Sequence, residues 1–176
     1  MPTSRIAYLT TATALMLVAS GVSAQNDPNT RSVDDKGVYF TLPRGWDWDG
    51  QGIAIRQAFK VKDAEYEATA ALVYETKKFA DMQIKDIEAK VEASKGFLKD
   101  LKIKKKYKMG PQKCAIASYT RTRGEGEDAE TFEERVVIFR RGDGCFTWTE
   151  SYNKKIASQA SSALESARKG FKFVDT

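Results

Sequence analysis

The sequence contains no histidine. Histidine is the commonest general base in enzymes and the commonest ligand of transition metals in proteins. Its absence excludes Ser-His-Asp and Cys-His catalysis. A zinc site would have to use Cys114, Cys145 and carboxylates, which lack the close paired spacing of structural zinc ligands. We therefore predict a non-catalytic protein that holds no metal and no cofactor.

The N-terminal apolar segment is too short and too interrupted to be a clear membrane span. It runs from Ile6 to Val18, and threonines break it. Arg5 precedes the segment and the small residues Val22-Ser23-Ala24 follow it, which is the pattern of a secretory signal peptide. We expect residues 1–24 to be a signal peptide that is cleaved near Ala24, so the protein is predicted to be periplasmic or secreted.

Cysteine is scarce, with only Cys114 and Cys145 in the sequence. No cysteine directly follows the signal peptide, which argues against a lipid-anchored lipoprotein. An exported protein often oxidises its cysteines in pairs. The predicted strands place these two roughly 10 Å apart, because a third strand lies between them, whereas a disulfide needs Cα atoms about 4.4 to 6.8 Å apart. The sequence therefore does not decide between a Cys114–Cys145 disulfide and two free thiols.

The chain is only mildly basic, with a formal net charge of +5, and Arg5 leaves with the signal peptide. A nucleic-acid-binding protein usually gathers positive charge on one face and carries a recognisable motif. An exported protein also rarely meets nucleic acid. We therefore expect no nucleic-acid partner, although a basic surface favours anionic partners.

The remainder of the chain is long enough for one domain with its own core. Gln25 to Lys36 has almost no apolar content and is predicted to be a flexible segment, so residues 37–176 form the single domain. Segments rich in β-branched and aromatic residues, separated by polar turns, predict strands. These strands are Val38–Leu42, Ile53–Val61, Tyr66–Tyr74, Leu101–Met109, Gln112–Arg123, Thr131–Arg141, Gly144–Tyr152 and the short Phe171–Val174.

Helical periodicity occurs in two places. The first helix is predicted from Asp81, as N-cap, to Lys95, and Gly96 ends it. The second follows Asn153, as cap, and runs to about Lys169. Segregated helices and antiparallel strands indicate an α+β fold. We expect an antiparallel β-sheet of about seven strands with two main helices packed on it. The expected buried residues of these helices are Ile84, Ile87, Val91, Ile156, Ala160, Leu164 and Ala167.

Two short motifs carry a resemblance to a known superfamily. A strand ends in Leu42-Pro43-Arg44-Gly45-Trp46, and the terminal helix leads into Phe171-Lys172-Phe173. With the middle helix and the strand meander, this pattern resembles the PsbP-like superfamily over nearly the whole mature chain. The resemblance implies an α/β/α sandwich. The superfamily includes extrinsic photosystem II proteins, DcrB-type bacterial envelope proteins and a fungal regulator of the Ran GTPase, which mostly bind other proteins.

The cluster Trp46, Asp47, Trp48 and Asp49 is the first candidate binding site. Aromatic side chains beside charges can anchor a partner, and the two aspartates could contribute to a calcium site, although the calcium-loop consensus needs more oxygen ligands. The alternative is structural, with one tryptophan in the core and the other covering a sheet edge. We favour the structural alternative because tryptophan is highly buried on average.

The second candidate surface is a lysine-rich strand. Lys102, Lys104, Lys106 and Lys108 alternate with Leu101, Ile103, Tyr107 and Met109, which predicts one basic and one apolar side. Such a face could attract an acidic protein or, weakly, an anionic membrane surface. Lysine also protects edge strands against pairing with other chains. We favour edge protection, and the two roles are compatible.

An acidic hairpin is the third candidate surface. Glu125, Glu127, Asp128 and Glu130, followed by Glu133 and Glu134, could attract a cation or a basic protein. Charge runs usually mark solvated loops, and we favour that interpretation.

The main functional hypothesis is a monomeric, exported, non-catalytic module that binds another envelope protein or assembly. One alternative is a small secreted hydrolase that uses carboxylates, such as Asp47 with Asp49. Another is a module that binds an anionic ligand or membrane surface.

Overall fold

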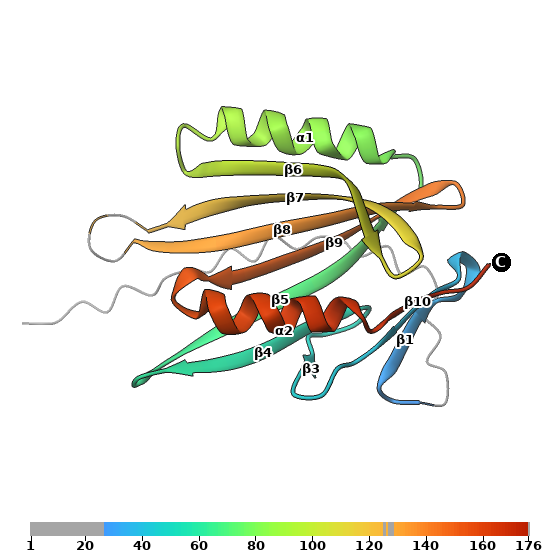
Figure 1. The fold of residues 1–176 in the computed structure, drawn as a ribbon, viewed down its shortest axis with the longest axis horizontal. Coiled ribbons are helices and arrows are strands. Elements are labelled where there is room, and N and C mark those ends of the chain that lie inside the picture. Colours follow the sequence, from blue (N-terminus) through green and yellow to red (C-terminus); the bar gives the residue numbers. More distant parts are fainter. Residues whose placement is uncertain (1–26, 125, 127–128, 176) are drawn as a thin grey trace, which may run out of the picture.

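The computed structural model describes residues 27–124, 126 and 129–175. It has an α+β architecture, as predicted, in which two helices pack on a seven-stranded sheet and a small three-stranded sheet lies beside it (Figure 1). The large sheet has the order β3-β4-β5-β9-β8-β7-β6, and each neighbouring pair is antiparallel. Its strands are β3 (Asp47–Trp48), β4 (Ala54–Val61), β5 (Ala64–Glu75), β6 (Leu98–Met109), β7 (Gln112–Arg123), β8 (Glu130–Arg141) and β9 (Gly144–Asn153).

The small sheet brings the two ends of the described chain together. It consists of β1 (Thr30–Val33), β2 (Val38–Thr41) and β10 (Phe171–Phe173), with β2 in the centre. The expectation of a flexible segment over residues 25–36 is therefore wrong for residues 30–36, which form β1 and a short 3-10 turn. The polar side chains of this segment gave no sign of a strand. The segment is ordered because its backbone groups form hydrogen bonds with β2.

Each face of the large sheet has its own helix and core. The α1 helix (Ala80–Ala93) contacts β6, β7 and β8 on one face, and α2 (Ala157–Arg168) contacts β5 and β9 on the other (Figure 1). The core under α2 is the larger, because the small sheet packs on the same side. Phe40 of β2 and Phe171 of β10 both contact Trp148 of β9, with ring centroids 5.3 and 5.0 Å away.

The helix ends differ in detail from the sequence prediction. Phe79 occupies the N-cap position of α1 and makes no capping side-chain hydrogen bond, so the assignment of Asp81 as N-cap was wrong. Asn153 caps a short 3-10 turn before α2, and its Oδ1 accepts a hydrogen bond from the Lys155 backbone at 2.9 Å. The residues predicted to be buried in the second helix and its first turn are buried. Of those predicted in α1, Ile84 is buried, whereas Ile87 and Val91 are half-buried.

The two cysteines are free and buried. Cys114 pairs across the ladder with Phe139, and Cys145 pairs with the next residue, Arg140. Since successive residues of a strand point to opposite faces, the thiols lie on opposite sides of the sheet, Cys114 in the α2 core and Cys145 in the α1 core. The sheet itself thus separates them.

Candidate functional site

The two tryptophans of the first candidate site have mainly structural contacts. Trp46 belongs to the core, with 6% of its surface exposed. Trp48 is half-buried on β3, an edge strand, where its Nε1 donates to the Pro28 carbonyl oxygen at 3.1 Å. The Arg31 guanidinium lies 4.1 Å from the Trp48 ring centroid. This arrangement matches the structural alternative, in which one tryptophan is core and the other covers a sheet edge.

Asp47 and Asp49 lie exposed beside these tryptophans. Asp47 pairs across the β3–β4 ladder with Arg56, and the Asp49 backbone donates to the Ala54 carbonyl. Among the described residues, no group of three or more carboxylate or thiol side chains could hold a metal ion. The two aspartates therefore lie outside any metal-binding cluster of this part of the chain.

The lysine-rich strand is an edge strand, as predicted. β6 forms the end of the large sheet opposite β3, so the lysines and the tryptophan cluster lie at opposite edges. All of its lysines are exposed, and within the described chain no ion pair joins any of them to a carboxylate. They are Lys99, Lys102, Lys104, Lys105, Lys106 and Lys108.

The predicted single lysine face is wrong, because β6 changes face along its length. Register irregularities lie between Lys99 and Lys102 and between Lys104 and Tyr107. Ile103 pairs with Ala117 of the α1 core, whereas Tyr107 pairs with Cys114 of the α2 core. An extra residue in one strand reverses the side-chain alternation beyond it.

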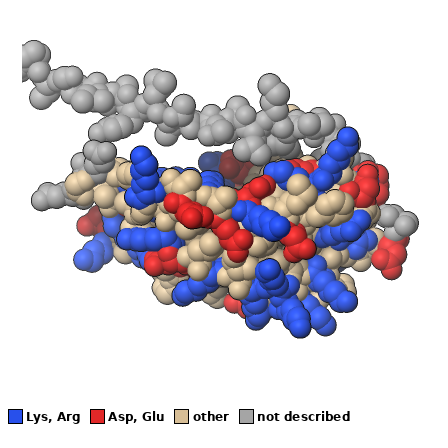
Figure 2. Space-filling model, turned by 90° about the horizontal axis from the view of Figure 1, so that it is seen from above, with Lys and Arg blue, Asp and Glu red and all other residues tan. Residues whose placement is uncertain are grey.

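The lysines therefore surround the edge instead of lining one face. Lys102 and Lys104 pair with Ser118 and Ile116 and share the α2 face, while Lys108 pairs with Lys113 on the α1 side. Lys105 and Lys106 lie within the second irregularity. In Figure 2, lysine and arginine side chains gather along the lower rim of the view, whereas acidic and basic side chains mix over the rest.

The acidic hairpin lies partly outside the described residues, namely at Glu125, Glu127 and Asp128. Glu134 is 4% exposed and lies 2.9 Å from Arg121, between their Oε1 and Nε atoms. Glu133 lies on the other face, as its neighbour in the strand must. Glu130 forms an ion pair with Lys155 at 3.6 Å. The described acids thus have partners within the chain.

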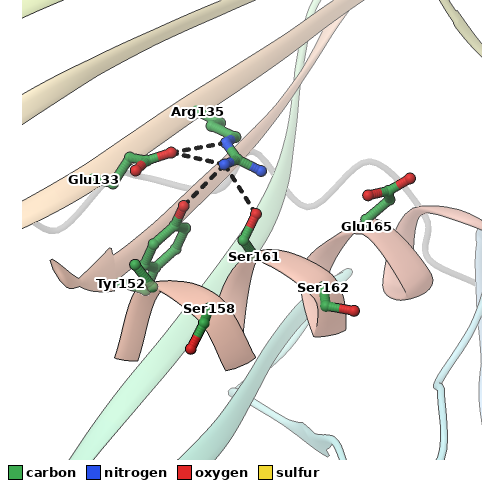
Figure 3. Close-up of a pocket in the computed structure, with 8 residues that line it drawn as sticks. Glu133, Arg135, Tyr152, Ser158, Ser161, Ser162 and Glu165 are labelled. Carbon is green, nitrogen blue, oxygen red and sulfur yellow. Dashed lines mark hydrogen bonds and ion pairs between the residues drawn. The ribbon is translucent and has the colours of Figure 1, made fainter. Parts of the chain in front are cut away.

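A polar cluster that sequence reasoning missed joins β8, β9 and α2. Arg135 donates from Nε and Nη2 to Glu133 Oε1 at 3.1 and 2.7 Å (Figure 3). Nη2 also donates to Tyr152 Oη at 2.9 Å and to Ser161 Oγ at 3.0 Å. The signal in the sequence was the pair of opposite charges Glu133 and Arg135, two residues apart on one strand, a spacing that puts both on one face.

The electrostatics of this cluster favour its ionised form. Burial raises the pKa of Glu133, but hydrogen bonds from Tyr152 and Arg135 lower it more, so the net shift is downward. For Arg135, burial lowers the pKa, but the bond to Glu133 and nearby negative groups raise it more. Burial also raises the pKa of Tyr152. Glu133 is thus a poor general acid at neutral pH.

A buried ion pair fastens α2 to the sheet. Glu150 of β9 is fully buried and accepts a hydrogen bond from Arg168 Nη1 at 2.7 Å. The Trp148 Nε1 donates to the same carboxylate at 2.9 Å. This group has no access to a ligand, so we assign it a structural role.

The sequence matches no protein-family model and no curated protein. Among solved structures, LpqN of Mycobacterium tuberculosis, described as involved in cell envelope biogenesis, matches 88% of this chain and 90% of its own, with 8% identity and a TM-score of 0.50. Cyanobacterial PsbP from Synechocystis matches 88% of this chain and 98% of its own, with 13% identity and a TM-score of 0.49. The chain has a fold similar to that of LpqN.

The observed layers agree with the α/β/α sandwich that the resemblance implied. At these sequence identities the likeness shows the fold alone. No helix of the described residues is long and apolar enough to cross a membrane. The expected signal peptide lies outside the described residues.

Proposed function

We propose that the protein is an exported, non-catalytic module of the cell envelope that binds an acidic surface of another envelope protein through β6. The observation that carries the proposal is the row of exposed lysines on this edge strand, whose charges have no ion-pair partner in the described chain. Unpaired lysines speed association with an acidic partner and make the complex sensitive to salt.

The shape of the edge supports a charge-based contact over strand addition. The register irregularities of β6 and its lysines are features that protect an edge against pairing with another strand. An added strand would also need a regular ladder of backbone groups. The partner would therefore contact lysine side chains on both sides of the edge, not the backbone.

The alternative hydrolase has less support. A carboxylate hydrolase would need a carboxyl group whose pKa is raised, facing a second one across a cleft. Glu133 and Glu165 both line one pocket, but the pKa of Glu133 is lowered. The fold similarity to a protein involved in cell envelope biogenesis is compatible with a binding role.

In-cell crosslinking followed by mass spectrometry tests the proposal. The parent is compared with Lys102→Glu/Lys104→Glu and with the matched control Lys85→Glu/Lys90→Glu on the exposed side of α1. We expect one recurrent envelope protein in the parent and control samples that is lost from the β6 variant. Purified complexes should weaken as salt rises.

Two results would reject the proposal. One is a recurrent partner that survives the β6 charge reversal. The other is the absence of any protein partner together with salt-sensitive attachment to vesicles that contain anionic lipid, which would instead support a membrane-surface module.

A further inference from the structure

A shallow pocket of about 440 Å³ lies between α2 and the β8–β9 part of the sheet. Its size falls within the range of small-molecule pockets. Seven of the residues that line it carry polar side chains, and Figure 3 shows them on the strands and along one side of α2. These residues are Glu133, Arg135, Tyr152, Ser158, Ser161, Ser162 and Glu165.

The side chains of the lining disfavour an apolar ligand. Most small-molecule pockets are largely apolar with a few polar groups, whereas the single apolar side chain here is Ala157. An apolar molecule would cover the serine hydroxyls and the charged groups without giving them hydrogen bonds, which costs free energy for each group.

The charges in the pocket also disfavour a simple ion. The two carboxylates, Glu133 and Glu165, repel an anion. Glu133 is already paired with Arg135, so Glu165 is the one carboxylate of the lining left for a cation, which is too few ligands to hold a metal ion. A neutral ligand with several hydroxyl groups avoids both problems. Each hydroxyl both donates and accepts, so it can bond a carboxylate, a serine or the guanidinium in turn.

The Arg135 side chain is held in place before a ligand arrives. Arg135 is fixed by bonds to Glu133, Tyr152 and Ser161 through Nε and Nη2. Its Nη1 has no hydrogen-bond partner among the described residues, and Figure 3 shows this nitrogen directed away from Glu133. A donor that is already fixed lowers the entropy cost of binding.

We infer that this pocket binds a sugar ring, with Arg135 Nη1 donating to a ring hydroxyl and the serines and Glu165 completing the hydrogen bonds. The pocket is open to solvent, so the ring can be a free monosaccharide or one residue of a glycan chain. The site does not use the β6 lysines, so this inference is independent of the proposed function.

Amide chemical shifts of the isotope-labelled protein, titrated with probes, test the inference. The probes are glucose, galactose and N-acetylglucosamine as free sugars, cellotetraose as a chain, and glycine and acetate as charged controls. We expect at least one sugar to shift the amides of Ser158, Ser161 and Ser162. Shifts with the chain alone would identify a glycan residue as the ligand, and shifts with a monosaccharide would identify a free sugar.

Two exposed serines of α2 give matched variants. Ser162→Tyr fills the pocket, and Ser166→Tyr places the same side chain on the helix outside the lining. We expect Ser162→Tyr to raise the Kd by about tenfold or more and Ser166→Tyr to leave it unchanged, with both variants folded by circular dichroism. The inference is overturned if no sugar shifts these amides, if glycine or acetate binds there in place of sugar, or if both variants bind equally well.

Discussion

At the scale of single residues, the thiols of Cys114 and Cys145 illustrate how burial controls reactivity. Burial raises the pKa of each to about 11. Since the thiolate is the reactive form, we expect iodoacetamide to modify neither cysteine in the folded protein at mildly alkaline pH, and both after unfolding in urea. Intact mass measures the labelling. Rapid labelling of the folded protein, or a disulfide seen without reductant, would contradict the separation of these thiols by the sheet.

The buried pair Glu150 and Arg168 leads to a second prediction. Arg168→Met leaves the Glu150 carboxylate buried without its cation, which we expect to lower the free energy of unfolding by roughly 3 to 5 kcal/mol. The double variant Glu150→Leu/Arg168→Met removes both charges and should recover most of that loss. Urea unfolding measures both values. A double variant that is less stable than Arg168→Met would show that the carboxylate is stabilised without Arg168.

At the scale of elements, the β6 edge combines lysines with irregular register. We predict that Lys102→Val/Lys104→Val makes the protein self-associate, because the edge loses charge and gains β-branched side chains. Light scattering after size exclusion measures the mass. Lys85→Val/Lys90→Val on α1 removes the same charge away from any edge and should remain monomeric. Equal association of both variants would mean that general hydrophobicity, and not the edge, is responsible.

The elements also show which local patterns predict structure. β7 has the predicted limits, Gln112 to Arg123, because strand alternation and polar turns on both sides specify it locally. β6 was predicted as an edge strand, but its predicted single lysine face is wrong, because nothing in its lysine-rich sequence marks the irregularities. β3 was missed because Asp47 and Trp48 are too few residues to show a period.

At the scale of the whole molecule, acid should destabilise the fold. The pKa of Glu133 lies below its ordinary value of about 4.5 in the folded protein. The ionised carboxylate of Glu133 therefore stabilises the folded state at pH values above about 4.5, and this stabilisation is lost as the pH falls through the folded pKa. The pKa of Asp143 is lowered too, by hydrogen bonds from Lys36 and Tyr74. Both carboxylates thus favour the folded state at neutral pH.

Glu133→Gln checks this pH dependence. We expect the variant to be less stable than the parent at neutral pH and to lose less stability on acidification, as measured by urea unfolding at a series of pH values. Glu165→Gln, at an exposed residue of the same pocket, serves as the control. If the parent and Glu133→Gln lose the same free energy of unfolding on acidification, Glu133 does not contribute to the acid sensitivity.

The sequence alone predicted the α+β class, the three consecutive strands from Gln112 to Tyr152, both helices and the exposed lysines. These features depend on periodicity and turn chemistry within a few neighbouring residues. The tertiary structure decided what distant residues do together. It paired β10 with β2, separated the lysines onto two faces, put the cysteines on opposite sides and assembled the pocket around Arg135. Such contacts depend on which segments meet in space, and local pattern does not contain that information.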